Sequence, residues 1–239
     1  TGYNQNLAES IKLALAQLGY SSEVMPTTPG NYNSSYWLSM VDATPLLLFA
    51  NNELQVLKDF INFGSVGQLI SEEINTPSKI FAFFGSDSRL AGKATIINYK
   101  QEYASYDGLL EIEEGLCLLK NTAIMPNTFS SDADVENTAT GIPYAMIKEN
   151  LQYGIWIHGD AFLEINQDNN QITFMSTGAC PMIFLENIGT NSGFANIPAA
   201  STGLPRNIAG FENLKLRLAD ETTPIFIDNV ANLQEEGAN

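Results

Sequence analysis

The first part of the chain alternates between hydrophobic patterns of helical and of strand period. From Asn6 to Leu18, apolar side chains recur every three or four residues, which predicts an amphipathic helix that ends at Gly19. Tyr20 to Met25 predicts a short strand, and Ser35 to Val41 predicts a short helix. This alternation indicates a layered α/β domain.

Two apolar runs in the same region have the length of buried strands. Pro45 to Ala50 is apolar on both faces, and Ile80 to Phe84 is a second such run. Between them, apolar side chains at residues 54–61 recur at helical spacing up to Gly64. Strands separated by helices predict a mostly parallel sheet with flanking helices, so the expected fold class is α/β.

The later part of the chain is richer in strands. Short strands are predicted at Ala94–Tyr99, Leu109–Ile112 and Gly154–His158. Phe162–Asn166 and Gln171–Met175 flank a polar turn, which predicts a β-hairpin.

The last part of the chain reads as a C-terminal extension. Residues 187–210 are rich in Gly, Asn, Ser, Pro and Ala, which predicts a long surface loop. Phe211–Leu218 and Pro224–Val230 then predict a closing pair of strands. We therefore expect an α/β domain over residues 1–185 and an extension with a long loop over residues 186–239.

Composition narrows the functional classes. The 239 residues are 44% hydrophobic, which is ample for a buried core, and no apolar run approaches the roughly 20 residues that span a bilayer. With 27 acidic against 11 basic residues, the formal net charge is -16, which disfavours nucleic acid as a partner. Low Lys content and abundant Asn, Ser and Thr favour an extracellular or cell-envelope setting, with protein partners, self-assembly or glycans as the candidate interactions.

Several local features bear on processing and redox state. Cys117 and Cys180 lie in apolar surroundings, which predicts buried free thiols, with a single disulfide as the alternative. The chain begins at Thr1, so we expect a processed or excised form. The sequon at Asn33 would accept a glycan in a secreted chain.

Three passages resemble a known family. Residues 84–92 read Phe-Gly-Ser-Asp-Ser-Arg-Leu-Ala-Gly, residues 115–119 read Gly-Leu-Cys-Leu-Leu, and residues 154–163 read Gly-Ile-Trp-Ile-His-Gly-Asp-Ala-Phe-Leu. They resemble the nucleophile elbow, the Gly-Leu-Gly-Leu-Leu run and the Gly-Ile-Gly-Ile-Asp-Glu segment of cyanophycinase-type serine peptidases, a branch of the class I glutamine-amidotransferase-like superfamily. The resemblance extends over residues 6–185 and implies a flavodoxin-like fold, whose first strand would precede Thr1.

The same resemblance implies a site for serine hydrolysis. In such peptidases the elbow exposes a Ser, a His takes its proton and an acid orients the His. In this chain Ser86 or Ser88 would be the nucleophile, His158 the base and Asp160 the acid.

The chain also departs from the family at the site. Where the family has a His-Phe pair, this chain has Thr128-Phe129, and Thr cannot act as a base near neutral pH. Arg89 and Leu90 replace the small residues that let a helix begin tightly after the nucleophile. These departures favour a domain that keeps the fold without the catalysis.

A second pairing involves the two residue types of a cysteine protease. His158-Gly159 and Ala179-Cys180 resemble the dyad of caspase-like proteases, whose Cys attacks as a thiolate. The hairpin predicted over 162–175 and the Pro that follows Cys180 argue against this reading.

No metal or cofactor is predicted. Asp132, Asp134 and Glu136 alternate as calcium ligands do, but the Gly and the distal Glu of an EF-hand loop are absent. Neither a Gly-x-Gly-x-x-Gly nor a Gly-x-x-x-x-Gly-Lys motif occurs. We therefore expect a non-catalytic structural or binding protein that presents loops such as 187–210, with the serine hydrolase as the alternative.

Overall fold

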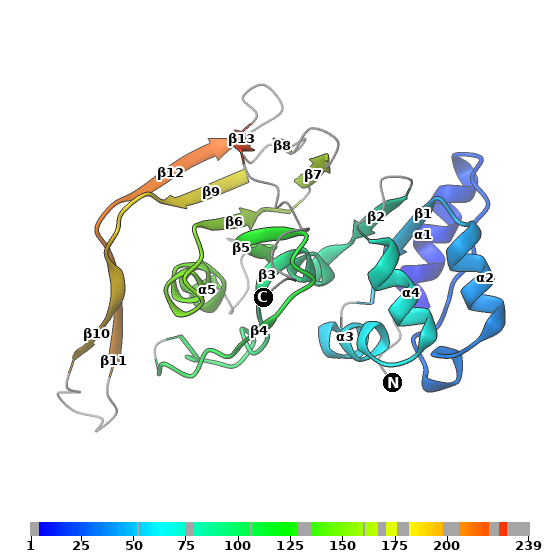
Figure 1. The fold of residues 1–239 in the computed structure, drawn as a ribbon, viewed down its shortest axis with the longest axis horizontal. Helices are drawn as coiled ribbons and strands as arrows, with labels where there is room; N and C mark the ends of the chain where they lie inside the picture. The colour runs from blue at the N-terminus through cyan, green and yellow to red at the C-terminus, as the bar shows by residue number, and fades with distance from the viewer. Residues whose placement is uncertain are drawn as a thin grey trace, which may run out of the picture. The chain divides into compact units, whose positions relative to one another are not determined.

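The structure, a computed structural model, describes residues 5–51, 53–74, 79–105, 107–128, 135–159, 161–166, 171–175, 182–197, 206–219 and 225–228. The chain divides into two compact units, Thr1–Ser88 and Arg89–Asn239. The domain boundary predicted at 185/186 stays a prediction, and its position falls inside strand β9 (Met182–Asn187). Helices and sheets occur in the same chain, which confirms the α/β class (Figure 1).

The first unit combines helices with a two-stranded parallel sheet. Its elements are α1 (Gln5–Gln17), η1 (Pro29–Asn31), α2 (Ser35–Ala43), β1 (Leu46–Phe49), α3 (Leu54–Asn62), α4 (Ser65–Glu73) and β2 (Ile80–Phe83). The helices predicted near 6–18, 35–41 and 54–64 are confirmed, as are the two strands. The hydrophobic pattern does not predict α4.

The parallel sheet of this unit is more exposed than its apolar strands suggest. Leu46 and Leu48 are 39% and 37% exposed, and Ile80 is 66% exposed. Among the described strands, β1 pairs with β2 alone. The expectation of a strand covered on both faces at Pro45–Ala50 is therefore wrong.

The predicted strand at Tyr20–Met25 is also wrong. Residues 20–28 form neither helix nor strand. Polar contacts hold the segment instead: the Tyr36 hydroxyl donates to the Glu23 carboxylate at 2.5 Å, and Asn31 Nδ2 donates to the Pro26 carbonyl at 2.7 Å. The stretch has too few apolar side chains to gain from burial in a sheet.

Lys79, which immediately precedes β2, closes the end of α2. Its ammonium group donates to the carbonyl oxygens of Val41, of Asp42 at 2.7 Å and of Thr44 at 3.3 Å. It also pairs with the Glu73 carboxylate on α4 at 2.7 Å. A cation at the last carbonyls of a helix satisfies acceptors that lack intrahelical donors and opposes the negative end of the helix dipole. Lys79 therefore ties α2, α4 and β2 together.

The second unit is built on a mixed six-stranded sheet in the order β12-β9-β6-β5-β3-β4. The strands not yet given are β3 (Gly92–Ile96), β4 (Ile112–Glu114), β5 (Leu119–Pro126), β6 (Tyr153–Ile157) and β12 (Leu214–Ala219). The central strands β3, β5 and β6 are parallel, whereas β4, β9 and β12 each run antiparallel to a neighbour. The expectation of a mostly parallel sheet is therefore wrong for this unit, where antiparallel strands extend the parallel centre on both sides.

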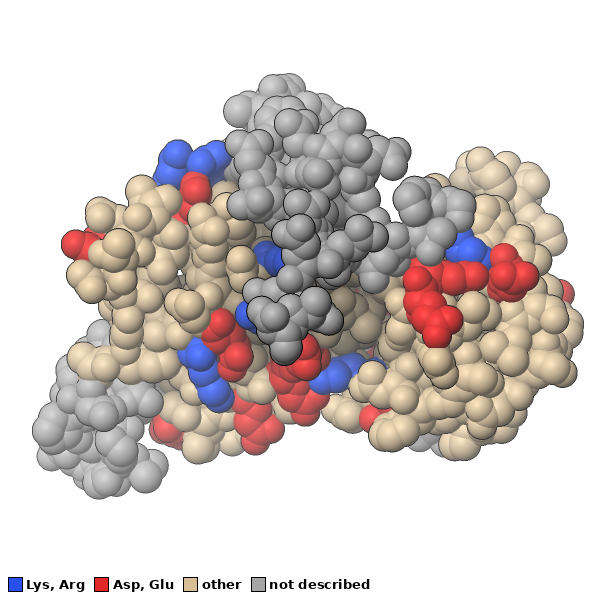
Figure 2. Space-filling model, in the orientation of Figure 1, with Lys and Arg blue, Asp and Glu red and all other residues tan. Residues whose placement is uncertain are grey.

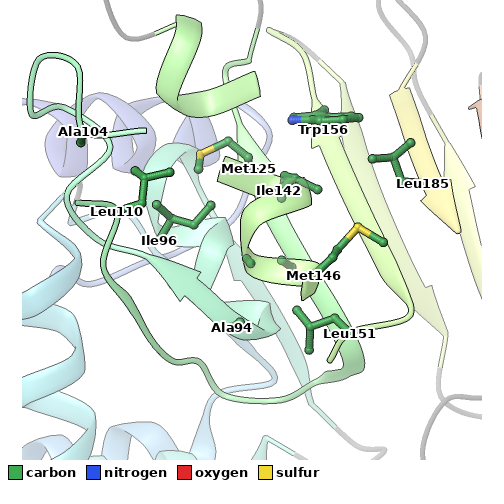
Figure 3. Close-up of a cluster of buried hydrophobic side chains, with 12 residues drawn as sticks. Ala94, Ile96, Ala104, Leu110, Met125, Ile142, Met146, Leu151, Trp156 and Leu185 are labelled. Atoms are coloured by element: carbon green, nitrogen blue, oxygen red, sulfur yellow. The ribbon is translucent and has the colours of Figure 1, made fainter. Parts of the chain in front are cut away.

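One helix, α5 (Val135–Lys148), packs on a face of this sheet (Figure 3). The hydrophobic cluster that α5 forms with this sheet consists of buried residues: Ala94, Ile96, Ala104, Leu110, Ala123, Met125, Ile142, Ala145, Met146, Leu151, Trp156 and Leu185. A Cβ atom at Gly154 would lie 2.3 Å from Ile142 Cγ2 and 2.8 Å from Met146 Sδ. Gly154 therefore allows the close approach of α5 to β6.

A separate three-stranded sheet has the order β13-β8-β7. Its strands are β7 (Phe162–Asn166), β8 (Gln171–Met175) and β13 (Ile225–Asp228). The antiparallel pairing of β7 with β8 confirms the predicted hairpin. The predicted closing pair is wrong, because β12 pairs with β9 while β13 pairs with β8.

The predicted long loop at 187–210 is wrong as well. Strands β10 (Ser192–Ile197) and β11 (Arg206–Phe211) pair antiparallel in this region. The Phe194 ring lies 5.1 Å from the Tyr144 ring of α5, so the ribbon packs beside that helix. Apolar side chains among the polar ones therefore give this segment a strand structure that its composition concealed.

The β10–β11 ribbon continues the β9–β12 pair through an irregular junction. Ile188 N donates to Asn213 O at 3.1 Å, and Glu212 N donates to Asn191 O at 2.9 Å. Gly189 and Thr190 on one strand therefore have no counterpart between Glu212 and Asn213 on the other. Extra residues on one strand form a bulge, which bends an antiparallel ribbon.

Candidate functional site

Ser86 and Ser88 lie on a 3₁₀-helix, η2 (Gly85–Ala91), that follows β2. The Ser88 Oγ donates to the Gly85 carbonyl at 2.8 Å, so this hydroxyl closes a turn of its own helix. Asp87 is fully buried, and its Oδ2 accepts a hydrogen bond from Asn51 N at 2.5 Å. The segment is thus bonded to the end of β1.

The residues after the two serines continue into a strand. Arg89 and Leu90 are 3% and 0% exposed, and η2 leads directly to β3. The Arg89 guanidinium donates to the Ile96 carbonyl and lies 4.5 Å from the centre of the Tyr99 ring. A nucleophile elbow joins a strand to a helix whose first N–H groups stabilise the oxyanion. In this chain, by contrast, β2 is followed by the short 3₁₀-helix η2 and then by strand β3.

Thr128 occupies the turn after β5. Its side chain is fully buried, and Oγ1 donates to the Met125 carbonyl at 3.1 Å. The preceding residue, Asn127, has a φ of 53°, which tightens this turn. The hydroxyl at the position of the family's His therefore stabilises the backbone, and Phe129 lies outside the described residues.

His158 follows β6 in the second unit. Its carbonyl accepts a hydrogen bond from Ala161 N at 2.8 Å, across Gly159 with its φ of 42°. The buried Nδ1 of His158 has no hydrogen-bond partner in the part of the chain that the structure describes. Asp160 lies outside the described residues. The pairing of His158 with Ser86 or Ser88 would join the two units and stays a prediction.

Cys117 is a free thiol on the turn before β5. Its backbone has a φ of 55°, and its N–H donates to the Gly92 carbonyl at 3.1 Å. Burial raises the pKa of the Cys117 thiol, although Lys93 and Lys120 act in the opposite direction. A thiol held protonated is a poor nucleophile. Cys180, and with it the caspase-like pairing, lies outside the described residues.

No group of three or more His, Cys, Asp and Glu side chains could hold a metal ion within the described residues. Asp132 and Asp134 lie outside them, and Glu136 is exposed in the first turn of α5. Within the same described residues, no helix has both the length and the apolar character needed to cross a membrane.

Some polar residues that belong to no sequence motif stabilise the backbone through buried hydrogen bonds. Asn137 is 3% exposed, and its Nδ2 donates to the carbonyls of Tyr99 and Gln101, each at 2.7 Å. Its Oδ1 accepts from Ser105 N at 2.8 Å. Asn137 therefore fixes the segment between β3 and β4 to α5, a role with no periodic signal in the sequence.

Asn33 stabilises the N-terminal end of α4, which is distant from it in the sequence. The Asn33 Oδ1 of the predicted sequon accepts hydrogen bonds from Ser65 N at 2.9 Å and Ser65 Oγ at 3.2 Å. Ser65 is the first residue of α4, so Asn33 satisfies one of the free N–H groups there.

Comparison with known proteins adds no family to these observations. No protein-family model matches the chain, and no curated protein matches it. The resemblance to cyanophycinase-type peptidases therefore remains an expectation from the three passages quoted above.

Proposed function

We infer that this chain is a non-catalytic structural or binding protein, belonging to an extracellular or cell-envelope assembly, on a degenerate flavodoxin-like fold of the glutamine-amidotransferase-like kind. The observation that carries this proposal is the connection after β2. There Ser88 bonds to the Gly85 carbonyl and η2 leads into β3 without an intervening α-helix. Such a connection lacks the helix N-terminus that an acyl-transfer site uses to stabilise an oxyanion.

Three further features support a structural role for the same region. Arg89 is buried against Tyr99, where an elbow has small residues. Thr128 replaces the family's His, and its hydroxyl is bonded to the Met125 carbonyl. Burial raises the pKa of Cys117, so this thiol is not a ready nucleophile near neutral pH.

A serine-directed fluorophosphonate tests the proposal. We expect no labelling of the wild-type chain above that of a Ser86→Ala, Ser88→Ala double variant, because neither hydroxyl is activated. Labelling of the folded wild type that disappears in either single Ala variant would overturn it. Heat-unfolded protein provides the background level.

One observation favours a serine hydrolase as the second candidate. His158 Nδ1 is buried and has no hydrogen-bond partner among the described residues. A catalytic His uses this atom to bond to an orienting acid, for which Asp160 stands two residues on. If this function holds, His158→Ala lowers kcat/KM on ester or peptide substrates by at least about 1000-fold. Retention of the wild-type rate by that variant removes this candidate.

A further inference from the structure

The six-stranded sheet of the second unit has two edges of opposite charge. Among the described strands, β12 pairs only with β9, and β4 pairs only with β3. β12 reads Leu-Lys-Leu-Arg-Leu-Ala, with Lys215 and Arg217 as its charged residues. β4 reads Ile-Glu-Glu, and Glu111 precedes it. One edge is therefore basic and the other acidic.

We propose that β12 of one copy pairs with β4 of a second copy, so that copies of this chain join head to tail through a continuous sheet. This proposal rests on the structural function inferred above and names its partner. Four observations support it: the strand directions, the backbone groups that point outward from each edge, the faces on which the side chains lie, and the charges.

The strand directions allow the junction. β3, β5 and β6 run in one direction, and β9 runs in the other. β12 is antiparallel to β9, so it runs with β3, whereas β4 runs against β3. A second copy in the same orientation therefore presents β4 antiparallel to β12.

The backbone groups that point outward from the two edges also match. Along an antiparallel strand, the backbone N–H and C=O groups of successive residues point alternately to the two neighbouring sides. The bond from Ile188 N to Asn213 O therefore shows that the odd-numbered residues of β12 direct these backbone groups toward β9. Leu214 and Leu216 therefore direct their N–H and C=O groups outward. In β4 the bonds from Ile97 N to Glu111 O and from Gly115 N to Lys93 O leave Ile112 and Glu114 directed outward.

Pairing Leu216 with Ile112 and Leu214 with Glu114 joins these outward positions in one register. In the same register Lys215 lies opposite Glu113, and Arg217 lies opposite Glu111. Opposite charges across neighbouring strands stabilise the pairing.

The side chains lie on compatible faces. Leu216 stands opposite Leu185 of the buried cluster, and it is 58% exposed on the α5 side of the sheet. Ile112 packs against the same cluster from β4. A shared sheet therefore places Leu216 against Ile112 on the α5 side, while the charged pairs lie together on the opposite side.

Pairing of like edges is disfavoured by the same residues. In a two-fold pairing of β12 with β12, every register that joins two or more outward residues of the strand sets Lys215 or Arg217 against a cation of the second copy. In a pairing of β4 with β4, the registers that join outward residues set Glu113 opposite Glu111 or Glu113, or Glu114 opposite Glu114. Like charges directly opposite destabilise a strand pair. The heterologous contact leaves one edge of each kind open, so it yields an open series of oligomers.

The surface view shows charged side chains at both edges. In Figure 2, blue side chains with a red neighbour lie over the end of the second unit that carries β12 and β9, and red side chains with blue neighbours lie in the region where Figure 1 draws β4. Arg217 bonds to Glu186 of β9 at 2.6 Å, so this guanidinium is paired within its own sheet.

Charge exchange at the Lys215–Glu113 pair tests the proposal. Sedimentation velocity of the full wild-type chain is expected to show dimers and higher oligomers that increase with concentration. Lys215→Glu and Glu113→Lys variants are each expected to lose at least tenfold in association constant. Mixing the two variants restores association, because each then offers the other an edge of opposite charge, and so does the double variant Lys215→Glu, Glu113→Lys.

Two further variants separate the edge contact from general effects. Lys100→Glu makes the same change in net charge at an exposed residue that belongs to neither β4 nor β12, and its association is expected to equal that of the wild type. Leu216→Pro removes an outward N–H and keeps the bonds to β9, since Pro is tolerated on an edge strand. It is expected to be folded by circular dichroism and monomeric.

The outcomes distinguish this proposal from the structural function on which it rests. A wild-type chain that is monomeric at all concentrations, or oligomers that Lys215→Glu and Leu216→Pro leave intact, would overturn the edge pairing. Neither result bears on the phosphonate labelling, which tests the inferred absence of a reactive serine.

Discussion

At the scale of single residues, polar side chains hold the backbone of this protein in place. Asn137 and Thr128, which are buried, and Asn33, which is exposed, each bond to backbone atoms. Such bonds contribute about 1 kcal/mol each, and losing one partner leaves a buried group unsatisfied at a greater cost. Ser88, one of the two candidate nucleophiles, has the same structural use, because its hydroxyl bonds to the Gly85 carbonyl.

Gly154 gives a direct test of packing between α5 and β6. Gly154→Ala is expected to lower the free energy of unfolding by about 2 kcal/mol, because its Cβ would overlap Ile142. Gly193→Ala is the control, since a Cβ atom there has no heavy atom within 4 Å. Urea denaturation measures both, and an equal effect of the two changes would contradict the packing argument.

The raised pKa of Cys117 predicts a pH dependence. Because the folded chain favours the protonated thiol, this residue contributes stability below the pKa of the thiol in the unfolded chain. That contribution is lost as the pH rises through the higher folded-state pKa. In a Cys180→Ser background, the midpoint of iodoacetamide alkylation against pH is expected to be higher for folded than for urea-unfolded protein. Coincident midpoints would exclude the shift.

At the scale of elements, the sequence predicts those whose stabilisation is local. Helix α1 and the β7–β8 hairpin follow from periodicity and turn residues alone. The β10–β11 ribbon does not, because the ring contact of Phe194 is with Tyr144, which is distant in the sequence. The candidate site is equally hard to predict from the sequence, because the hydrogen bonds of the Ser88 and Thr128 hydroxyls depend on backbone turns rather than on residue type.

Lys79 is the element-scale contact with the largest expected effect. Lys79→Met keeps most of the apolar stem but leaves Glu73 and the end of α2 without their cation. The free energy of unfolding of the first unit is expected to fall by about 3 kcal/mol. Fluorescence of Trp37 on α2 reports this in a Trp156→Phe background. Lys12→Met on α1 is the control, and an equal loss in both variants would contradict the role of Lys79.

At the scale of the whole molecule, the chain consists of two units with different sheets. The first keeps a short parallel pair, while the second extends a parallel centre with antiparallel strands at both sides. Helix and strand periods predict the class of such a chain but not the sheet order, because strand neighbours are chosen by contacts between distant segments. For the same reason the parallel pattern near the start was a poor guide to the later strands.

The bulge at Gly189 and Thr190 decides which face of the β10–β11 ribbon lies toward α5. Leu185 on β9 and Phe194 on β10 both lie toward α5, although an uninterrupted pleat would place residues of opposite parity on opposite faces. Phe211 packs against the same cluster. The junction therefore turns the ribbon over between its two halves.

Deletion of Gly189 and Thr190 would restore a continuous antiparallel ladder between β9–β10 and β11–β12. It would also turn β10 and β11 over, so that their opposite face lies toward α5. Phe194 and Phe211 would then turn away from α5, so we expect faster hydrogen exchange in β10 and β11 while β9 and β12 keep their protection. Gly189 and Thr190 therefore decide which face of the β10–β11 ribbon lies toward α5.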